Sequence, residues 1–136
     1  IIEKAIKIND PNPNDPLDIL AKIGGLEIAA MVGAILEAAS QNVPTILDGI
    51  ISSAAALVAA KFNPLVIEYL IPSHSSEEKG ELVALKHLGL EPRLFFNMRL
   101  GEGTGAALMF PMVEAALKIA DEMATFDTAG VTTGDF

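Results

Sequence analysis

One pattern recurs three times along this chain: an apolar stretch of strand length, a short polar or glycine-rich cluster, and a helical stretch. The first unit has VPTIL, then DG, then a helix over about 52–62, and the second has VIEYLI, then PSHSS, then a helix over about 77–88. The third has RLFFNMRL, then GEGTG, then a helix from Ala106 to about Thr125. Strands that alternate with helices of this length predict a parallel sheet with right-handed crossovers.

The segment before these units divides into a leader and the start of the main body. NDPNPNDP at 9–16 carries three prolines and predicts a loop, and Asp15 with Pro16 then predicts a helix start, with an end at Gly24 and Gly25. Residues 26–39 are small or apolar on nearly all sides, which predicts a buried, central helix. We therefore expect a leader at 1–14, a partial Rossmann-like α/β domain at 15–126, and an extended or disordered tail at 127–136.

Composition excludes several classes of function. Nine basic against eighteen acidic residues give a net charge of −9, which repels nucleic acids and anionic membranes. There is no Cys, which is compatible with a reducing cytoplasm, and every apolar stretch is interrupted before it reaches bilayer length. The two histidines lie thirteen positions apart without nearby carboxylates at ligand spacing, so we expect no metal and no cofactor. The start at Ile1, without Met, suggests a chain cut from a longer protein.

Polar side chains follow each predicted strand. Asp48, the PSHSS cluster and Glu102 all fall at the carboxyl ends of strands, where ligands bind in open parallel sheets. In the last cluster Gly101, Gly103 and Gly105 enclose Glu102 and Thr104, and glycine lets a ligand approach the backbone closely. This spacing is neither that of the P-loop nor that of the dinucleotide fingerprint, so a dehydrogenase-like domain is not expected.

Two interpretations of Glu102 stand side by side on pattern alone. It could be a general base on a bare backbone, with Leu100, Met98 and Phe95 as apolar surroundings. It could equally lie in the first turn of the following helix and complement the helix dipole. The spacing of the glycines does not choose between them.

Several stretches carry a resemblance to a known family. RLGEGTGAAL with EMATF downstream, preceded by DPLDILAKIGG, VPTILDG and IPSHSS, resembles the nicotinate-nucleotide–dimethylbenzimidazole phosphoribosyltransferase family, in the family's order, from Asp15 to Phe126. The resemblance implies a homodimeric enzyme of cobalamin lower-ligand synthesis, acting on nicotinate mononucleotide and an azole base such as dimethylbenzimidazole. Its fold would be a parallel α/β domain with a smaller helical domain. This chain would be the carboxy-terminal portion, with a phosphate loop and a second glutamate upstream.

The resemblance also implies roles for individual residues. Glu102 would be the general base, Leu100 would line the azole pocket, and Asp48 and Ser76 would line the nucleotide site, with Gly49 and Ser73 as neighbours. Gly101 and Gly103 complete the expected substrate-binding set. A non-catalytic nucleotide-binding or assembly module of the same fold is the alternative.

Other polar residues have simpler interpretations. Arg99 could pair with an acid or with the carboxylate of nicotinate, and Thr104 is a secondary candidate within the motif. His74 could contact a phosphate, although a hydrogen-bonding surface residue is the favoured interpretation. The charged run Glu77, Glu78, Lys79 and Glu81 is typical of a solvated helix face.

Overall fold

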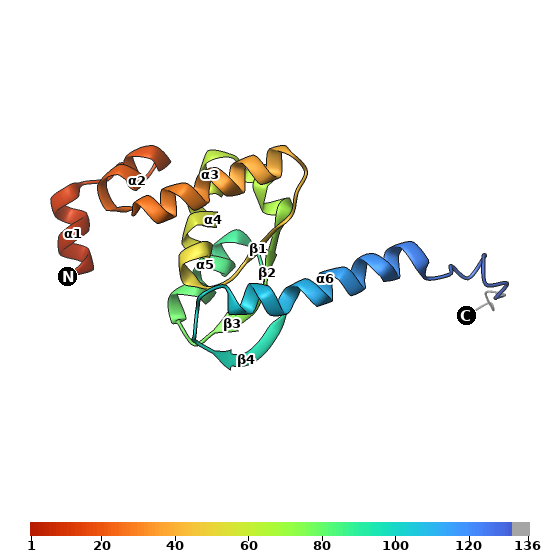
Figure 1. Ribbon diagram of the computed structural model, residues 1–136. Helices are drawn as coiled ribbons and strands as arrows, with labels where there is room; N and C mark the ends of the chain where they lie inside the picture. The colour runs from red at the N-terminus through yellow and green to blue at the C-terminus, as the bar shows by residue number, and fades with distance from the viewer. Residues whose placement is uncertain (132–136) are drawn as a thin grey trace, which may run out of the picture.

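The computed structural model describes residues 1–131 (Figure 1). Its helices are α1 (Ile2–Asn9), α2 (Pro16–Ile23), α3 (Leu26–Ser40), α4 (Ile50–Phe62), α5 (Lys79–Leu88) and α6 (Thr104–Glu122), with a 3-10 helix η1 (Pro64–Tyr69). Its strands are β1 (Thr45–Leu47), β2 (Leu70–Pro72), β3 (His74–Ser76) and β4 (Leu94–Met98). No helix within these residues is long and apolar enough to cross a membrane.

The strands form two parallel pairs, β1 with β2 and β3 with β4, as the repeated pattern predicts. Only Ser73 separates β2 from β3. Its N–H donates to Leu47 O at 3.1 Å, and its carbonyl accepts from the N–H groups of Arg93 and Leu94 at 3.0 and 2.9 Å. β2 and β3 are therefore one bent strand that changes partner at Ser73, from β1 on one side to β4 on the other.

The predicted second strand is wrong in its first four residues. Val66, Ile67, Glu68 and Tyr69 belong to η1, and the strand begins only at Leu70. The reason lies just upstream, where Asn63 Oδ1 accepts the N–H of Leu65 at 3.1 Å and Pro64 occupies the first position of the 3-10 helix. A capping Asn followed by Pro starts a helical turn, and this local signal overrides an apolar run that fits a strand equally well.

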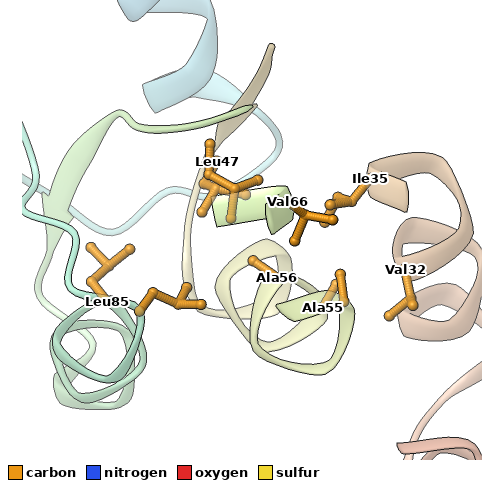
Figure 2. Close-up of a cluster of buried hydrophobic side chains, with 10 residues drawn as sticks. Val32, Ile35, Leu47, Ala55, Ala56, Val66 and Leu85 are labelled. Carbon is orange, nitrogen blue, oxygen red and sulfur yellow. The ribbon is translucent and has the colours of Figure 1, made fainter. Parts of the chain in front are cut away.

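The apolar core lies around α4 (Figure 2). α4 packs against α3 on one side and α5 on the other, and its Ala55, Ala56 and Ala59 are fully buried. Small side chains let the neighbouring helices approach closely, and Val32, Leu47 and Val66 fill the space between them. The prediction that 26–39 forms the central helix is wrong: α3 buries only Val32 and Ile35, because α4 takes the position between layers.

The two ends of the chain lie outside this core. α1 and α2 bury no residue, and Asp15 caps α2 as predicted, accepting from the N–H groups of Leu17 and Asp18 at 3.0 and 3.2 Å. α6 starts beside β1, β3 and β4 and then runs away from the body (Figure 1). The tail predicted to be extended or disordered starts with a turn, in which Ala129 N–H donates to Thr125 O, and its residues 132–136 lie outside the described part.

Candidate active site at the carboxyl end of the strands

A pocket of about 340 Å³ lies where β1 and β4 end. Its walls come from α3, the β1–α4 turn, the start of α5 and the turn before α6. The residues that line it are Met31, Asp48, Gly49, Ile50, Ile51, Ser52, Glu78, Gly101, Glu102 and Gly103. Five of the predicted site residues thus surround one cavity, although more than fifty positions separate Asp48 and Gly49 from Gly101, Glu102 and Gly103.

Glu102 lies outside helix α6 and in an uncommon backbone conformation. Gly101, Glu102 and Gly103 all have positive φ angles, of 77°, 59° and 78°, and the helix begins only at Thr104. Of the two interpretations that the pattern left open, the one that places Glu102 in the first turn of the helix is therefore wrong. A left-handed conformation at a residue with a side chain costs of order 1–3 kcal/mol and persists only where the surroundings hold it. The turn presents Glu102 at the rim of the pocket.

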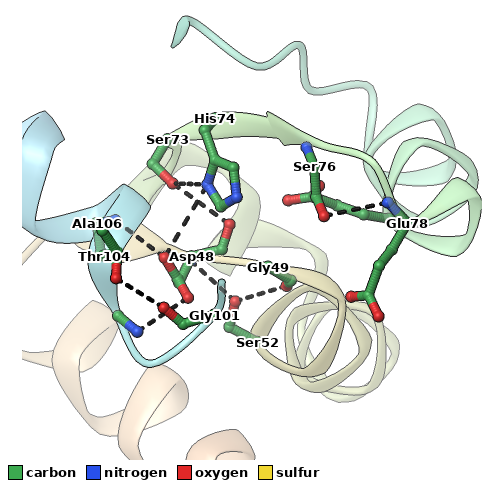
Figure 3. Close-up of polar contacts among 12 residues, drawn as sticks. Asp48, Gly49, Ser52, Ser73, His74, Ser76, Glu78, Gly101, Thr104 and Ala106 are labelled. Carbon is green, nitrogen blue, oxygen red and sulfur yellow. Dashed lines mark hydrogen bonds and ion pairs between the residues drawn. The ribbon is translucent and has the colours of Figure 1, made fainter. Parts of the chain in front are cut away.

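Asp48 ties this turn to the end of β1 (Figure 3). Its Oδ2 accepts the N–H of Gly103 and its Oδ1 accepts the N–H of Ala106, both at 3.1 Å. Within the turn, Thr104 Oγ1 donates to the carbonyl of Gly101 at 2.8 Å. Because Gly103 is the N-cap of α6 and has no side chain, Asp48 supplies the acceptor that an N-cap residue normally provides.

Behind the pocket lies a buried cluster that includes Ser73, His74 and Ser76. The interpretation of His74 as a surface residue is wrong, since it is 2% exposed. Its Nδ1 lies 3.1 Å from Ser73 Oγ and 4.0 Å from Asp48 Oδ1. A Cβ added to Gly105 would overlap the imidazole of His74, so this ring lies directly against the start of α6.

Glu81 also belongs to this cluster, against the prediction of a solvated helix face. It is 1% exposed, and its Oε2 accepts the backbone N–H of Ser76 at 2.7 Å. Burial raises the pKa of Glu81, while the N–H of Ser76 and the nearby His74 act in the opposite direction. Helical periodicity did not reveal this burial, which arises because Ser76 N–H needs an acceptor inside the fold.

Some predicted residues do not reach the pocket. Leu100 is 70% exposed and Phe95 is 72% exposed, and neither lines the cavity. Arg99 is exposed, and it takes part in none of the ion pairs among residues 1–131. Ser76 is buried, and its Oγ accepts the N–H of Glu78 at 3.2 Å. The Ser76 hydroxyl, for which a nucleotide contact is expected, is thus already hydrogen-bonded within the protein.

Sequence reasoning missed the apolar wall and one carboxylate of the pocket. The wall comes from Met31, Ile50 and Ile51, which precede or follow the predicted loops and have no polar signature. Glu78 lines the cavity two residues after β3. The rule that placed Asp48 and Glu102 at strand ends applies equally to Glu78, and it could have identified this residue.

Within the described part of the chain, no three His, Asp or Glu side chains gather in a way that could hold a metal ion. The lining of the pocket does include three carboxylates, Asp48, Glu78 and Glu102, but they are not arranged as metal ligands, and an apolar wall accompanies them. Such a site can bind a flat ring with its apolar face against the wall and accept a proton from a nitrogen of that ring.

Comparisons with known proteins identify the family and the fold of this chain. A family model described as phosphoribosyltransferase matches residues 1–131. A nicotinate-nucleotide–dimethylbenzimidazole phosphoribosyltransferase from Desulforamulus reducens is 52% identical over 98% of this chain, and one from Geotalea uraniireducens is 51% identical over all of it. The crystal structure of the enzyme of that name from Thermus thermophilus superimposes with a TM-score of 0.89 at 40% identity, over 98% of this chain and 40% of the other. The chain spans only 38% and 39% of the length of the two curated relatives.

Proposed function

This chain belongs to the phosphoribosyltransferase family, and on that premise we propose that the protein containing it moves the ribose phosphate of nicotinate mononucleotide onto dimethylbenzimidazole. The product would be the nucleotide of the cobalamin lower ligand, and nicotinate would be released. The chain has a partial Rossmann-like α/β fold, and it matches 40% of the length of the Thermus thermophilus enzyme. In this proposal, residues 15–126 are the carboxy-terminal portion of the catalytic domain.

One observation carries the proposal: a carboxylate stands on a left-handed turn, outside any helix, at the rim of a pocket with an apolar wall. Glu102 directly precedes the N-cap Gly103 and lines the pocket, so its carboxylate is available to a ligand as well as to the dipole of α6. An azole ring needs an apolar surface for its face and one acceptor for its N–H. Met31, Ile50 and Ile51 offer the surface, and Glu102 offers the acceptor.

The chemistry needs one base and no general acid. The bond from the ribose anomeric carbon to the pyridinium nitrogen breaks, and its electron pair returns to the ring, so nicotinate leaves with a neutral ring nitrogen. A benzimidazole nitrogen forms the new bond to the same carbon, and the other ring N–H becomes acidic as positive charge develops. Glu102 accepts that proton, while the pocket holds the two rings close together and in the orientation that the transfer needs. Attack opposite the leaving group inverts the anomeric configuration.

The remaining site residues have narrower roles in this proposal. Gly49, Gly101 and Gly103 give the substrates access to the backbone, and Ser73 and Ser76 support the nucleotide side of the pocket from behind. The cavity lining contains three acidic residues and no Lys or Arg. In this proposal the phosphate of nicotinate mononucleotide is therefore bound by a part of the protein outside this chain. Leu100 and Arg99, both exposed here, would contact substrate or the rest of the enzyme.

We also propose that the protein is a cytoplasmic homodimer. Support comes from the family resemblance, from the absence of Cys, and from apolar side chains that stand exposed along α6, among them Phe110 and Leu117. Sedimentation of the full-length protein would test the dimer.

The test of the function is nicotinate release by the full-length protein incubated with nicotinate mononucleotide and dimethylbenzimidazole. Glu102→Gln removes the base and keeps the shape, so kcat should fall by about 10²–10⁴-fold. The control is Glu37→Gln, a matched change at an exposed position of α3 that does not line the pocket, which should leave kcat unchanged.

Two results would contradict the proposal. Unchanged turnover in Glu102→Gln would remove the base assignment. Binding of the mononucleotide by the wild-type protein without any release of nicotinate would favour a nucleotide-binding module that lacks catalysis.

A further inference from the structure

We infer that Asp48 is the positioning residue for Glu102: its carboxylate holds the turn that presents the base. This inference rests on the proposed function for its kinetic consequences. It changes the expected role of Asp48, which the family resemblance places among the nucleotide contacts. The contacts within the chain point to the turn before α6 instead.

The first support is a pair of hydrogen bonds at the end of the turn and in the first turn of α6. Asp48 Oδ2 accepts from Gly103 N–H, the residue after Glu102, and Oδ1 accepts from Ala106 N–H, one helical turn further on. Two bonds from one carboxylate fix both the position and the orientation of the backbone between them. Because the Gly103 N–H belongs to the peptide that joins Glu102 to Gly103, the backbone directly after Glu102 is held from β1, across 55 and 58 positions of sequence.

The second support is that this turn needs an external restraint. Gly101 and Gly103 flank Glu102, and glycine constrains its own backbone less than any other residue. Glu102 itself has a φ of 59°, a conformation that a residue with a side chain leaves unless its surroundings hold it. Inside the turn, Thr104 contributes hydrogen bonds to Gly101 only, so the link between the turn and the strands comes from Asp48.

The third support is that Asp48 is itself fixed. Its backbone N–H donates to Ser52 Oγ at 2.9 Å, and its carbonyl accepts from Ser73 Oγ at 3.3 Å. The buried His74 ring lies 4.0 Å from its Oδ1 and packs against Gly105 on the other side. A carboxylate restrained at its backbone and its head group can transmit the position of β1 to the turn.

The alternative role, a direct ribose contact, makes a different kinetic prediction. A substrate contact of Asp48 would act independently of Glu102, so removing each would give losses that multiply. A positioning residue acts only through Glu102, so its removal should matter little once the base is gone. The two roles separate in a double-mutant cycle.

The cycle uses the full-length protein with Asp48→Asn, Glu102→Gln and the double variant. In Asp48→Asn an amide N–H₂ faces a backbone N–H, so the turn shifts, and kcat should fall by about 10²-fold with little change in KM for nicotinate mononucleotide. In the Glu102→Gln background, Asp48→Asn should lower kcat by less than about threefold. Multiplied losses, or a raised KM with unchanged kcat, would overturn the inference.

Asp15→Asn is the matched control. Asp15 also accepts two backbone N–H groups at a helix start, but at α2, away from the pocket. Its substitution alters a cap of the same kind and should leave kcat unchanged. If Asp15→Asn lowered kcat as much as Asp48→Asn, the effect would be one of general stability, and the positioning role would be wrong.

Amide hydrogen exchange gives a second readout that does not depend on activity. In the wild-type protein the amides of Gly103 and Ala106 should be protected, and Asp48→Asn should accelerate exchange at both. Unchanged exchange at these amides would overturn the inference even if the enzyme is active. Accelerated exchange in a protein that releases no nicotinate would support the restraint of the turn and count against the proposed function alone.

Discussion

Two buried regions of this molecule differ in the polarity of their side chains. Around α4 the core is built mainly from apolar side chains, among them Leu47, Val66 and three alanines, with the buried hydroxyl of Ser53 as an exception. Behind the pocket, by contrast, the buried residues are Ser73, His74, Ser76 and Glu81, each with a polar partner. The first region gains its free energy from surface removed from water, which is non-directional. The second gains less per residue but fixes orientations, because hydrogen bonds depend on angle as well as distance.

The largest expected effect is on stability, in the apolar region. Leu47 is 1% exposed, and Leu47→Ala leaves a cavity between β1 and α4, so the free energy of unfolding should fall by about 2–5 kcal/mol. Denaturant unfolding of the full-length protein measures this. Leu47→Met keeps the volume and should cost less than about 1.5 kcal/mol. Equal losses in both variants would show that the position does not behave as a packed core site.

The next effect concerns the polar region and should appear in both stability and turnover. Gly105→Ala forces a Cβ into the ring of His74, which is buried and has no room to move, so unfolding should become easier by about 1–3 kcal/mol and kcat should fall. The matched control is Gly33→Ala in α3, where nothing lies within 4 Å of the added Cβ. That change should stabilise the helix by up to about 1 kcal/mol. If Gly105→Ala left stability and kcat unchanged, His74 would not support the start of α6.

The smallest effect is a change in pH dependence. Burial raises the pKa of Glu81 above its ordinary value of 4.5, so the folded state prefers the protonated carboxyl, and stability should decline as the pH rises from there towards the raised pKa. Glu81→Gln removes this decline and keeps an oxygen for Ser76 N–H. Denaturant unfolding across this pH range measures the difference between variant and wild type, which should grow with pH.

Asp18→Asn provides the opposite case for comparison. Hydrogen bonds from Asn12 and then Lys22 lower the pKa of Asp18, so its contribution to stability is present above its ordinary pKa and is lost as the pH falls through the lowered value. The two variants should therefore move the pH profile in opposite directions. Parallel profiles for Glu81→Gln and wild type would contradict the burial of the Glu81 carboxylate.

The comparison also separates what the sequence could predict from what it could not. Three strand-to-helix units, the Asp15 cap and the convergence of Asp48 with Glu102 follow from local patterns and one rule about parallel sheets. The burial of His74 does not, because its ring lies against Asp48 and Gly105, which are distant in sequence. Nor does the burial of Glu81, whose carboxylate turns back to the N–H of Ser76, a contact that helical periodicity does not contain. The central position of α4 was missed for a similar reason, since α3 and α4 are both rich in small residues and only packing chooses between them.

The bond between Asp48 and the turn before α6 also sets an order for assembly. Translation proceeds from the amino end at about 5–20 residues per second, so Asp48 is made roughly 3–12 seconds before Ala106, its partner 58 positions later. Throughout that interval the Asp48 carboxylate lacks its Ala106 N–H partner, even if the apolar core around α4 has already formed. Contacts between such distant positions form late, because the chain between them must first be ordered. The turn that carries Glu102 is therefore among the last parts to be completed, and a chain released before Ala106 lacks one of the two N–H groups that Asp48 holds.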